Sequence, residues 1–334
     1  MTDIRPFACL MVRRDADGQV ACGVETISLE DLPPGDVLIE VVCSSLNYKD
    51  ALACQGHPGV VRQWPHVPGI DCAGQVVESS SSQFRVGDPV LVTGYGLGSN
   101  CWGGYARYVR VPADWVVALP DGLTPEEAMT YGTAGFTAAQ CVSALQRQAI
   151  EPDRGEIAVT GASGGVGSLA VALLAKLGYQ VVAVTGKASQ ANLLQQLGAR
   201  RVLPREEVND VSDKPLLAAR WAAAVDTVGG NPLATLLRST QHRGCVAACG
   251  LAAGPDLPLT VYPFILRGVT LVGIDSAQCP RAPRLAIWQH LAGDWRVDPL
   301  ARLTHEITLA DVPRQAAAML AGKTWGRTLV RPID

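Results

Sequence analysis

A glycine-rich turn between an apolar segment and a helix-like segment carries the clearest chemistry in this chain of 334 residues. The apolar segment Ile157–Thr160 is followed by the turn Gly161–Gly167 and by helix-forming residues up to Lys176. Glycines let a backbone approach a pyrophosphate closely, and the free N–H groups at the start of a helix attract its negative charge. We therefore expect a dinucleotide site whose pyrophosphate lies against Ser163, Gly164, Gly165 and Val166.

The end of the next expected strand bears on which nicotinamide cofactor is used. In NAD-binding proteins, an acidic residue about 20 positions further on holds the ribose 2′-hydroxyl. The corresponding stretch, Val184–Asn192, contains no Asp or Glu and instead offers Thr185, Gly186 and Lys187. A hydroxyl, a flexible glycine and an ammonium suit a 2′-phosphate, so we predict NADPH as the cofactor. Arg205 is a second candidate phosphate contact, and an ordinary surface position is the alternative for both basic side chains.

Composition narrows the class of protein. Hydrophobic residues make up 48% of the chain and charged residues 18%, so a large core can form. The net charge of −3, without a basic run, argues against a nucleic-acid partner. There is neither an apolar stretch of membrane-spanning length nor an apolar signal-peptide core near the N-terminus, so we expect a cytoplasmic protein. The ten cysteines are scattered singly, which is typical of free, buried thiols.

The pattern of turns and apolar runs divides the chain near Thr124. Before it, short alternating runs such as Asp36–Val42 are separated by Pro and Gly turns and predict a β-rich region. After it, helices and strands alternate, and Thr124 with Glu127 fits a capping box. This rhythm predicts an α/β fold with a doubly wound parallel sheet. The expected helices are 126–146, 166–177, 189–197 and one containing 316–320; the expected strands are 157–160, 180–184, 201–203, 223–228, 246–250, 269–274 and 328–330.

Three segments resemble landmarks of the medium-chain dehydrogenase/reductase superfamily. Val67–Gly74 resembles its P-G-x-D/E-x-x-G segment, Phe84–Val90 its F-x-x-G-D-x-V turn, and Trp102–Ala106 its G-G-x-A segment. The resemblance extends over nearly the whole chain. It implies a β-rich GroES-like substrate domain of residues 1–125 with 298–334, and a Rossmann NADPH-binding domain of residues 126–297.

Shorter segments resemble one branch of that superfamily. Leu46–Asp50, Thr185–Lys187, Val202–Arg205 and Pro263–Val269 are similar to the zinc-free, quinone oxidoreductase-like YhdH/YhfP branch, which contains acrylyl-CoA reductases. Membership implies NADPH-dependent reduction of an activated C=C bond, with acryloyl-CoA going to propionyl-CoA. Two alternatives stay open, a broad quinone or enone oxidoreductase and a non-catalytic NADPH-binding sensor.

Zinc-dependent relatives hold their catalytic metal with a Cys and a Gly-His-Glu segment. Here Cys43 lies near the first ligand position, but the segment reads Gly69-Ile70-Asp71, and isoleucine cannot ligate a metal. The second zinc of those relatives needs four closely spaced cysteines, and only Cys101 lies in that region. We therefore expect no metal.

Asn47 and Tyr48 are the catalytic candidates that the resemblance implies. Hydride addition to the β-carbon of an unsaturated thioester or ketone forms an enolate, which needs hydrogen-bond donors and a proton. Tyr48 is expected to stabilise the enolate or the nicotinamide amide, with packing against the nicotinamide ring as the alternative. Asn47 would position the substrate carbonyl. Asp50 is expected to be structural and to hold Lys49 or Arg62.

Further contacts follow from the same resemblance. Thr133, Leu251 and Ser276 are expected at the cofactor. Arg327 is a candidate contact for a CoA phosphate, with a salt bridge inside the β-rich domain as the alternative. The apolar segment Val269–Ile274 is expected to be an edge strand that joins two subunits in a homodimer.

Overall fold

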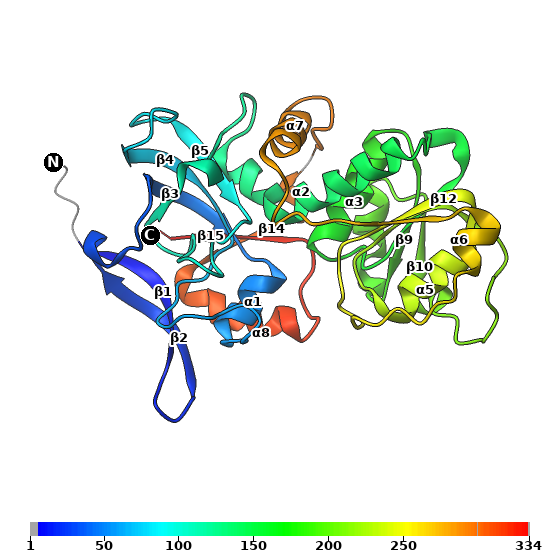
Figure 1. Ribbon diagram of the computed structural model, residues 1–334, viewed down its shortest axis with the longest axis horizontal. Helices are drawn as coiled ribbons and strands as arrows, with labels where there is room; N and C mark the ends of the chain where they lie inside the picture. The colour runs from blue at the N-terminus through cyan, green and yellow to red at the C-terminus, as the bar shows by residue number, and fades with distance from the viewer. Residues whose placement is uncertain (1–5, 299, 333–334) are drawn as a thin grey trace. The chain divides into compact units, whose positions relative to one another are not determined.

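The computed structural model describes residues 6–298 and 300–332 and divides into two compact units (Figure 1). The first unit contains the residues up to Thr133, Ala277–Ala292 and the residues from 300 on; the second contains Ala134–Ser276 and Gly293–Asp298. The domain limits expected from the sequence, 125/126 and 297/298, assign residues 277–292 to the nucleotide-binding part, whereas the structure groups them with the first unit. The reason is visible at Arg284, whose buried guanidinium donates to the Thr93 carbonyl at 2.6 Å.

The first unit is built on a mixed seven-stranded sheet and a separate two-stranded hairpin. The sheet order is β14-β15-β3-β4-β5-β7, and β6 pairs with β3. One apolar core lies between the hairpin, α1 and α8, and another lies within the sheet. The elements are β1 (Phe7–Arg14), β2 (Val20–Ile27), β3 (Val37–Ser45), α1 (Tyr48–Cys54), β4 (Asp71–Ser79), β5 (Pro89–Thr93), β6 (Tyr108–Val111), β7 (Val117–Ala118), α7 (Arg281–Ala292), β14 (Thr304–Thr308), α8 (Val312–Leu320) and β15 (Arg327–Arg331).

The second unit is a parallel six-stranded sheet with helices packed against it (Figure 1). The order β10-β9-β8-β11-β12-β13 is that of a Rossmann fold, with its switch point between β8 and β11. The elements are β8 (Glu156–Val159), α3 (Gly165–Lys176), β9 (Gln180–Thr185), α4 (Ala191–Gln196), β10 (Arg201–Pro204), β11 (Trp221–Asp226), α5 (Gly230–Ser239), β12 (Thr240–Ala248), α6 (Tyr262–Arg267) and β13 (Thr270–Gly273).

Helix α2 (Pro125–Arg147) has residues in both units and bends at Gly132, where φ is 49° and ψ is −155°. Its start confirms the predicted capping box. The Thr124 N–H donates to Glu127 Oε2 at 3.0 Å, and the Glu127 N–H donates to Thr124 Oγ1 at 3.2 Å. Among the helices of the described residues, none is both long and apolar enough to cross a membrane.

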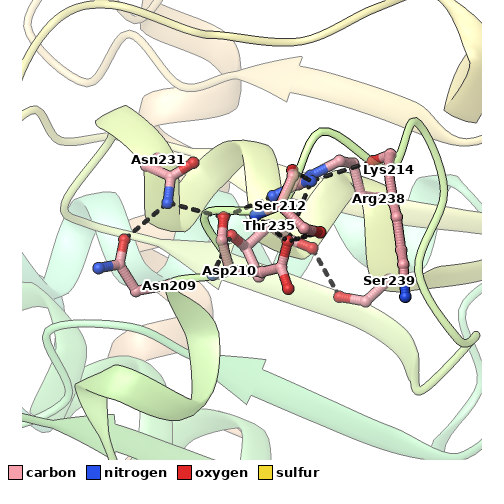
Figure 2. Close-up of polar contacts among 8 residues, drawn as sticks. All are labelled: Asn209, Asp210, Ser212, Lys214, Asn231, Thr235, Arg238 and Ser239. Atoms are coloured by element: carbon pink, nitrogen blue, oxygen red, sulfur yellow. Dashed lines mark hydrogen bonds and ion pairs between the residues drawn. The ribbon is translucent and has the colours of Figure 1, made fainter.

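A buried arginine on α5 holds the loop that precedes β11 (Figure 2). The Arg238 guanidinium donates to the carbonyls of Asp210 at 2.7 Å, Ser212 at 2.8 Å and Lys214 at 3.0 Å. The Asp210 N–H in turn donates to Thr235 Oγ1 at 3.0 Å. The single buried guanidinium thus fixes a loop whose Ser212 and Lys214 are themselves exposed.

The doubly wound sheet predicted from the sequence is therefore confirmed, with strand limits displaced by a few residues. Helices α1, α5, α6 and α7 were not predicted, and α7 shows one reason. The buried face of α7 consists of Arg284, Ile287, Trp288 and Leu291. Because a charged residue takes one of these positions, the apolar pattern that predicts a helix is interrupted.

Candidate functional site

In the second unit, the glycine-rich turn has the tight geometry that a dinucleotide loop needs. Gly161 has φ of 58°, a conformation that favours glycine, and a Cβ there would collide with the Thr227 side chain. A Cβ on Gly167 would lie only 2.8 Å from the Ala162 Cα, so α3 packs closely against the turn. The backbone of residues 163–166 thus lies at the start of a 12-residue helix, which fits a pyrophosphate.

Two hydroxyl groups join the turn to the end of β9. Ser163 Oγ and Thr185 Oγ1 are 2.9 Å apart, and both residues are buried. The Lys187 N–H donates to the same Thr185 oxygen at 3.1 Å. Thr185 therefore shapes the loop that carries Lys187, and its hydroxyl is already used inside the protein.

A hollow of about 210 Å³ lies at the ends of β9 and β10, lined by Thr185, Gly186, Pro204 and Glu206 among others. A Cβ on Gly186 would come within 3.2 Å of the Arg205 side chain, so this glycine lets the arginine lie against the loop. Lys187 is half-buried, and this burial lowers its pKa because the charged form is desolvated. Arg205 is exposed and pairs with the neighbouring acid Glu206 at 3.2 Å.

A second hollow, of about 510 Å³, lies at the carboxyl ends of β12 and β13 and is lined by Cys249, Gly250, Leu251, Ile274 and Asp275 among others. Open parallel sheets bind their ligands at this edge. Leu251 is 63% exposed there. Ser276 is half-buried and follows the last lining residue in the chain.

In the first unit, the catalytic candidates Tyr48 and Asn47 lie at the start of α1 but differ in exposure. Tyr48 is 49% exposed, whereas Asn47 is 8% exposed. The Asn47 amide nitrogen donates to Asp71 Oδ2 at 2.8 Å, and its oxygen accepts from Arg327 at 3.2 Å. Because both ends of this amide have protein partners, the geometry favours a positioning role for Asn47 over the expected contact with a substrate carbonyl.

Arg327 requires a correction. Its side chain is 2% exposed, and it donates to the Thr130 carbonyl at 2.8 Å and to Ser45 Oγ at 2.9 Å, as well as to Asn47. Burial lowers the pKa of this guanidinium, and the charge of Asp71 opposes the shift. A side chain so enclosed cannot reach a CoA phosphate on the surface, so that expectation has no support in the structure.

Asp50 is structural, as expected, but its partners are different. The fully buried carboxylate accepts from the N–H groups of Asn47 at 2.8 Å, Gly69 at 3.1 Å and Ile70 at 2.8 Å rather than holding Lys49 or Arg62. Burial and then the charge of Asp71 raise the pKa of Asp50 to about 7. Asp50 thus joins the start of α1 to the segment that precedes β4.

Asp71 was not among the candidate site residues, although it lies in the Gly69-Ile70-Asp71 segment. Its Oδ2 accepts from the Thr133 N–H at 2.8 Å, and its Oδ1 accepts from the Thr133 hydroxyl at 2.6 Å. Thr133 is therefore held at the bend of α2. The signal in the sequence was an acid retained in the P-G-x-D segment after the neighbouring metal ligand had been lost.

The residues at the expected metal position do not fit a zinc ion. Cys43 is fully buried, and this burial raises the pKa of its thiol to about 12. Ile70 offers no ligand atom, and the Asp71 carboxylate already accepts hydrogen bonds from Ser45, Asn47 and Thr133. Within residues 6–298 and 300–332, no group of three or more His, Cys, Asp or Glu side chains is placed to hold a metal.

Comparison with known families and proteins agrees with this architecture. Residues 33–121 match the alcohol dehydrogenase GroES-like domain, and residues 165–288 match the family called zinc-binding dehydrogenase. The chain is 46% identical to the acrylyl-CoA reductase AcuI of Ruegeria pomeroyi, with 97% of this chain and 98% of that protein aligned.

Two solved structures are similar over their whole length. The YhdH oxidoreductase of Salmonella enterica, crystallised with NADP, is 50% identical and superposes with a TM-score of 0.95, covering 98% of this chain and 100% of that one. YhfP of Bacillus subtilis, crystallised with NAD, is 46% identical with a TM-score of 0.95 and the same coverage. The chain therefore belongs to the YhdH/YhfP branch of the medium-chain dehydrogenase/reductase superfamily.

Proposed function

We propose that this protein is an NADPH-dependent reductase of activated C=C bonds and that acryloyl-CoA, reduced to propionyl-CoA, is its substrate. The observation that carries the proposal is the 46% identity to an acrylyl-CoA reductase over almost the full length of both chains. The Rossmann unit, with its glycine turn and the two hollows at the ends of its strands, supports the proposal.

The choice of NADPH over NADH rests on the loop after β9. Thr185, Gly186 and Lys187 stand where an NAD-binding protein places an acid, and Arg205 lies against Gly186. Residues 163–166 would hold the pyrophosphate, and Leu251 and Ser276 would lie toward the nicotinamide end. The Salmonella relative was crystallised with NADP and the Bacillus relative with NAD, so a direct comparison of the two cofactors in solution is the decisive assay.

In this proposal the protein positions the substrate and stabilises the negative charge that develops on it. NADPH supplies the hydride when it is bound. The substrate carbonyl oxygen gains negative charge during the reduction, and a donor placed at that oxygen lowers the barrier. Tyr48 is the exposed donor at the start of α1 and has this role in our proposal. No step needs a metal, because the thioester already activates the C=C bond and the residues near Cys43 do not fit zinc.

We also propose a homodimer. Strand β13 ends the six-stranded sheet, and within the described residues it pairs with β12 alone. Exposed apolar side chains lie on α6 close to it in sequence: Tyr262 at 45%, Ile265 at 68% and Leu266 at 58%. An edge strand beside such a patch favours pairing with a second copy. A monomeric mass in light scattering would contradict this.

We propose a cytoplasmic location, which the thiols support. All ten cysteines are free, and most are buried. Free thiols in this number are usual in a reducing compartment.

The test is NADPH oxidation, followed at 340 nm, with acryloyl-CoA, a simple enone and a quinone, each repeated with NADH. Fast turnover that requires acryloyl-CoA and NADPH supports the proposal. Equal turnover of quinones would indicate a broad reductase, equal rates with NADH would contradict the 2′-phosphate assignment, and tight NADPH binding without turnover would indicate a sensor.

A further inference from the structure

Four buried side chains in the first unit, among them Asn47 directly before Tyr48, form a closed ring of hydrogen bonds. Arg327 donates to Ser45 Oγ at 2.9 Å, and Ser45 donates to Asp71 Oδ2 at 2.6 Å. Asn47 donates to the same Asp71 oxygen at 2.8 Å, and Arg327 closes the ring by donating to Asn47 Oδ1 at 3.2 Å. All four residues are less than 9% exposed, so their hydrogen bonds are shielded from water.

The ring is attached to two elements that the proposed reaction uses. Asn47 precedes Tyr48 and the first turn of α1, so the ring fixes the backbone that presents the phenol. On the other side, Arg327 Nε donates to the Thr130 carbonyl at 2.8 Å, and Asp71 accepts two hydrogen bonds from Thr133. The ring therefore holds α2 just before and just after its bend at Gly132.

The bend itself is fitted to the ring. A Cβ on Gly132 would lie 2.6 Å from Asp71 Oδ2, 2.7 Å from Ser45 Oγ and 2.9 Å from Arg327 Nη2. Because real contacts are not this short, the ring closes only where residue 132 has no side chain. The carboxylate of Asp71 and the guanidinium of Arg327 are thus buried beside Gly132, which has no side chain. A purely apolar core would not require this arrangement.

We propose that Asp71 and Arg327, bridged by Ser45, are positioning residues for the reduction: together they fix Tyr48 through Asn47 and fix Thr133 directly. The role of Asp71 and Arg327 in the reduction rests on the proposed function. The structural part, that one ring orders both segments, stands independently of any substrate.

The matched pair Ser45→Ala and Ser44→Ala tests the proposal. Both serines are fully buried and adjacent, and each donates one hydrogen bond to Asp71. Ser44 donates to the backbone carbonyl at 2.5 Å and lies outside the ring, whereas Ser45 donates to the carboxylate within it. Each variant loses one buried hydroxyl, and the variants differ in that Ser45 Oγ also accepts from Arg327 and Asn47 within the ring.

The first readout is hydrogen–deuterium exchange of the full chain, followed by mass spectrometry. Ser45→Ala should speed exchange about tenfold both in residues 47–54 and in residues 130–136, and Ser44→Ala should not. Equal exchange in the two variants, or an effect of Ser45→Ala on only one segment, would overturn the proposal. This readout needs no substrate and is informative even if the wild-type protein reduces none of the acceptors.

The second readout is steady-state kinetics with the acceptor that the wild type reduces. Ser45→Ala should lower kcat about tenfold to 100-fold, with a smaller change in KM, and Ser44→Ala should stay near wild type. Arg327→Lys keeps the charge but loses the fork that bridges Ser45 and Asn47, so it should resemble Ser45→Ala. Wild-type kcat in both ring variants would refute the positioning role, whereas absence of turnover in the wild type would refute only the proposed function.

Discussion

Replacing Gly132 by alanine should destabilise the first unit far more than a comparable substitution elsewhere. The residue has φ of 49° and ψ of −155°, a region that costs a non-glycine residue about 1–3 kcal/mol. The new Cβ would also lie within 2.9 Å of polar atoms on Asp71, Ser45 and Arg327. Displacing one of these atoms breaks at least one hydrogen bond to a charged group, worth about 1.5–3 kcal/mol. The sum is a loss of about 2.5–6 kcal/mol in the free energy of unfolding.

Gly87→Ala is the control for this prediction. Gly87 also has a positive φ, 93°, but a Cβ there would have nothing within 4 Å. Gly87→Ala should therefore lower the free energy of unfolding only by the backbone cost of about 1–3 kcal/mol. Urea unfolding followed by circular dichroism gives both values, provided that the m-values agree. If the two variants differ by less than about 1 kcal/mol, the ring does not constrain the bend, and the reasoning fails.

Three further predictions concern single residues. Lys187→Ala should raise KM for NADPH about tenfold or more and leave KM for NADH nearly unchanged, because it removes a charged contact to the 2′-phosphate alone; an equal rise for both cofactors in the 340 nm assay would contradict this. Tyr48→Phe should lower kcat about 100-fold without weakening NADPH binding measured by fluorescence, and wild-type kcat would exclude Tyr48 as the donor. The pKa of Asp50 is raised to about 7 in the folded protein, so the stability it confers is present at low pH and is lost as pH rises from about 4 to about 7. Urea unfolding at several pH values should show this decline in the wild type and a smaller one in Asp50→Asn, and identical slopes would contradict the assignment.

Much of the fold could be predicted because its signals are local. Apolar runs separated by turns indicated the strands of the second unit, and the glycine turn indicated which strand comes first in the Rossmann order. Thr124 and Glu127 marked the start of α2 by their spacing alone. Helix α7 could not be predicted in this way, because Arg284 lies on its buried face. A buried arginine can be recognised only once its hydrogen-bond acceptors are known.

The sequence by itself determined the doubly wound sheet, the glycine turn and the absence of an acid after β9, since each depends on neighbouring residues and their backbone preferences. Tertiary structure decided the roles of Asn47, Asp71 and Arg327. Asn47 lies 24 positions before Asp71, and Arg327 lies 256 positions after it. No periodicity relates the three residues, yet they share one hydrogen-bonded ring. A side chain expected at a ligand from a resemblance, as Arg327 was, can instead be enclosed by long-range packing, because burial is a property of the folded whole.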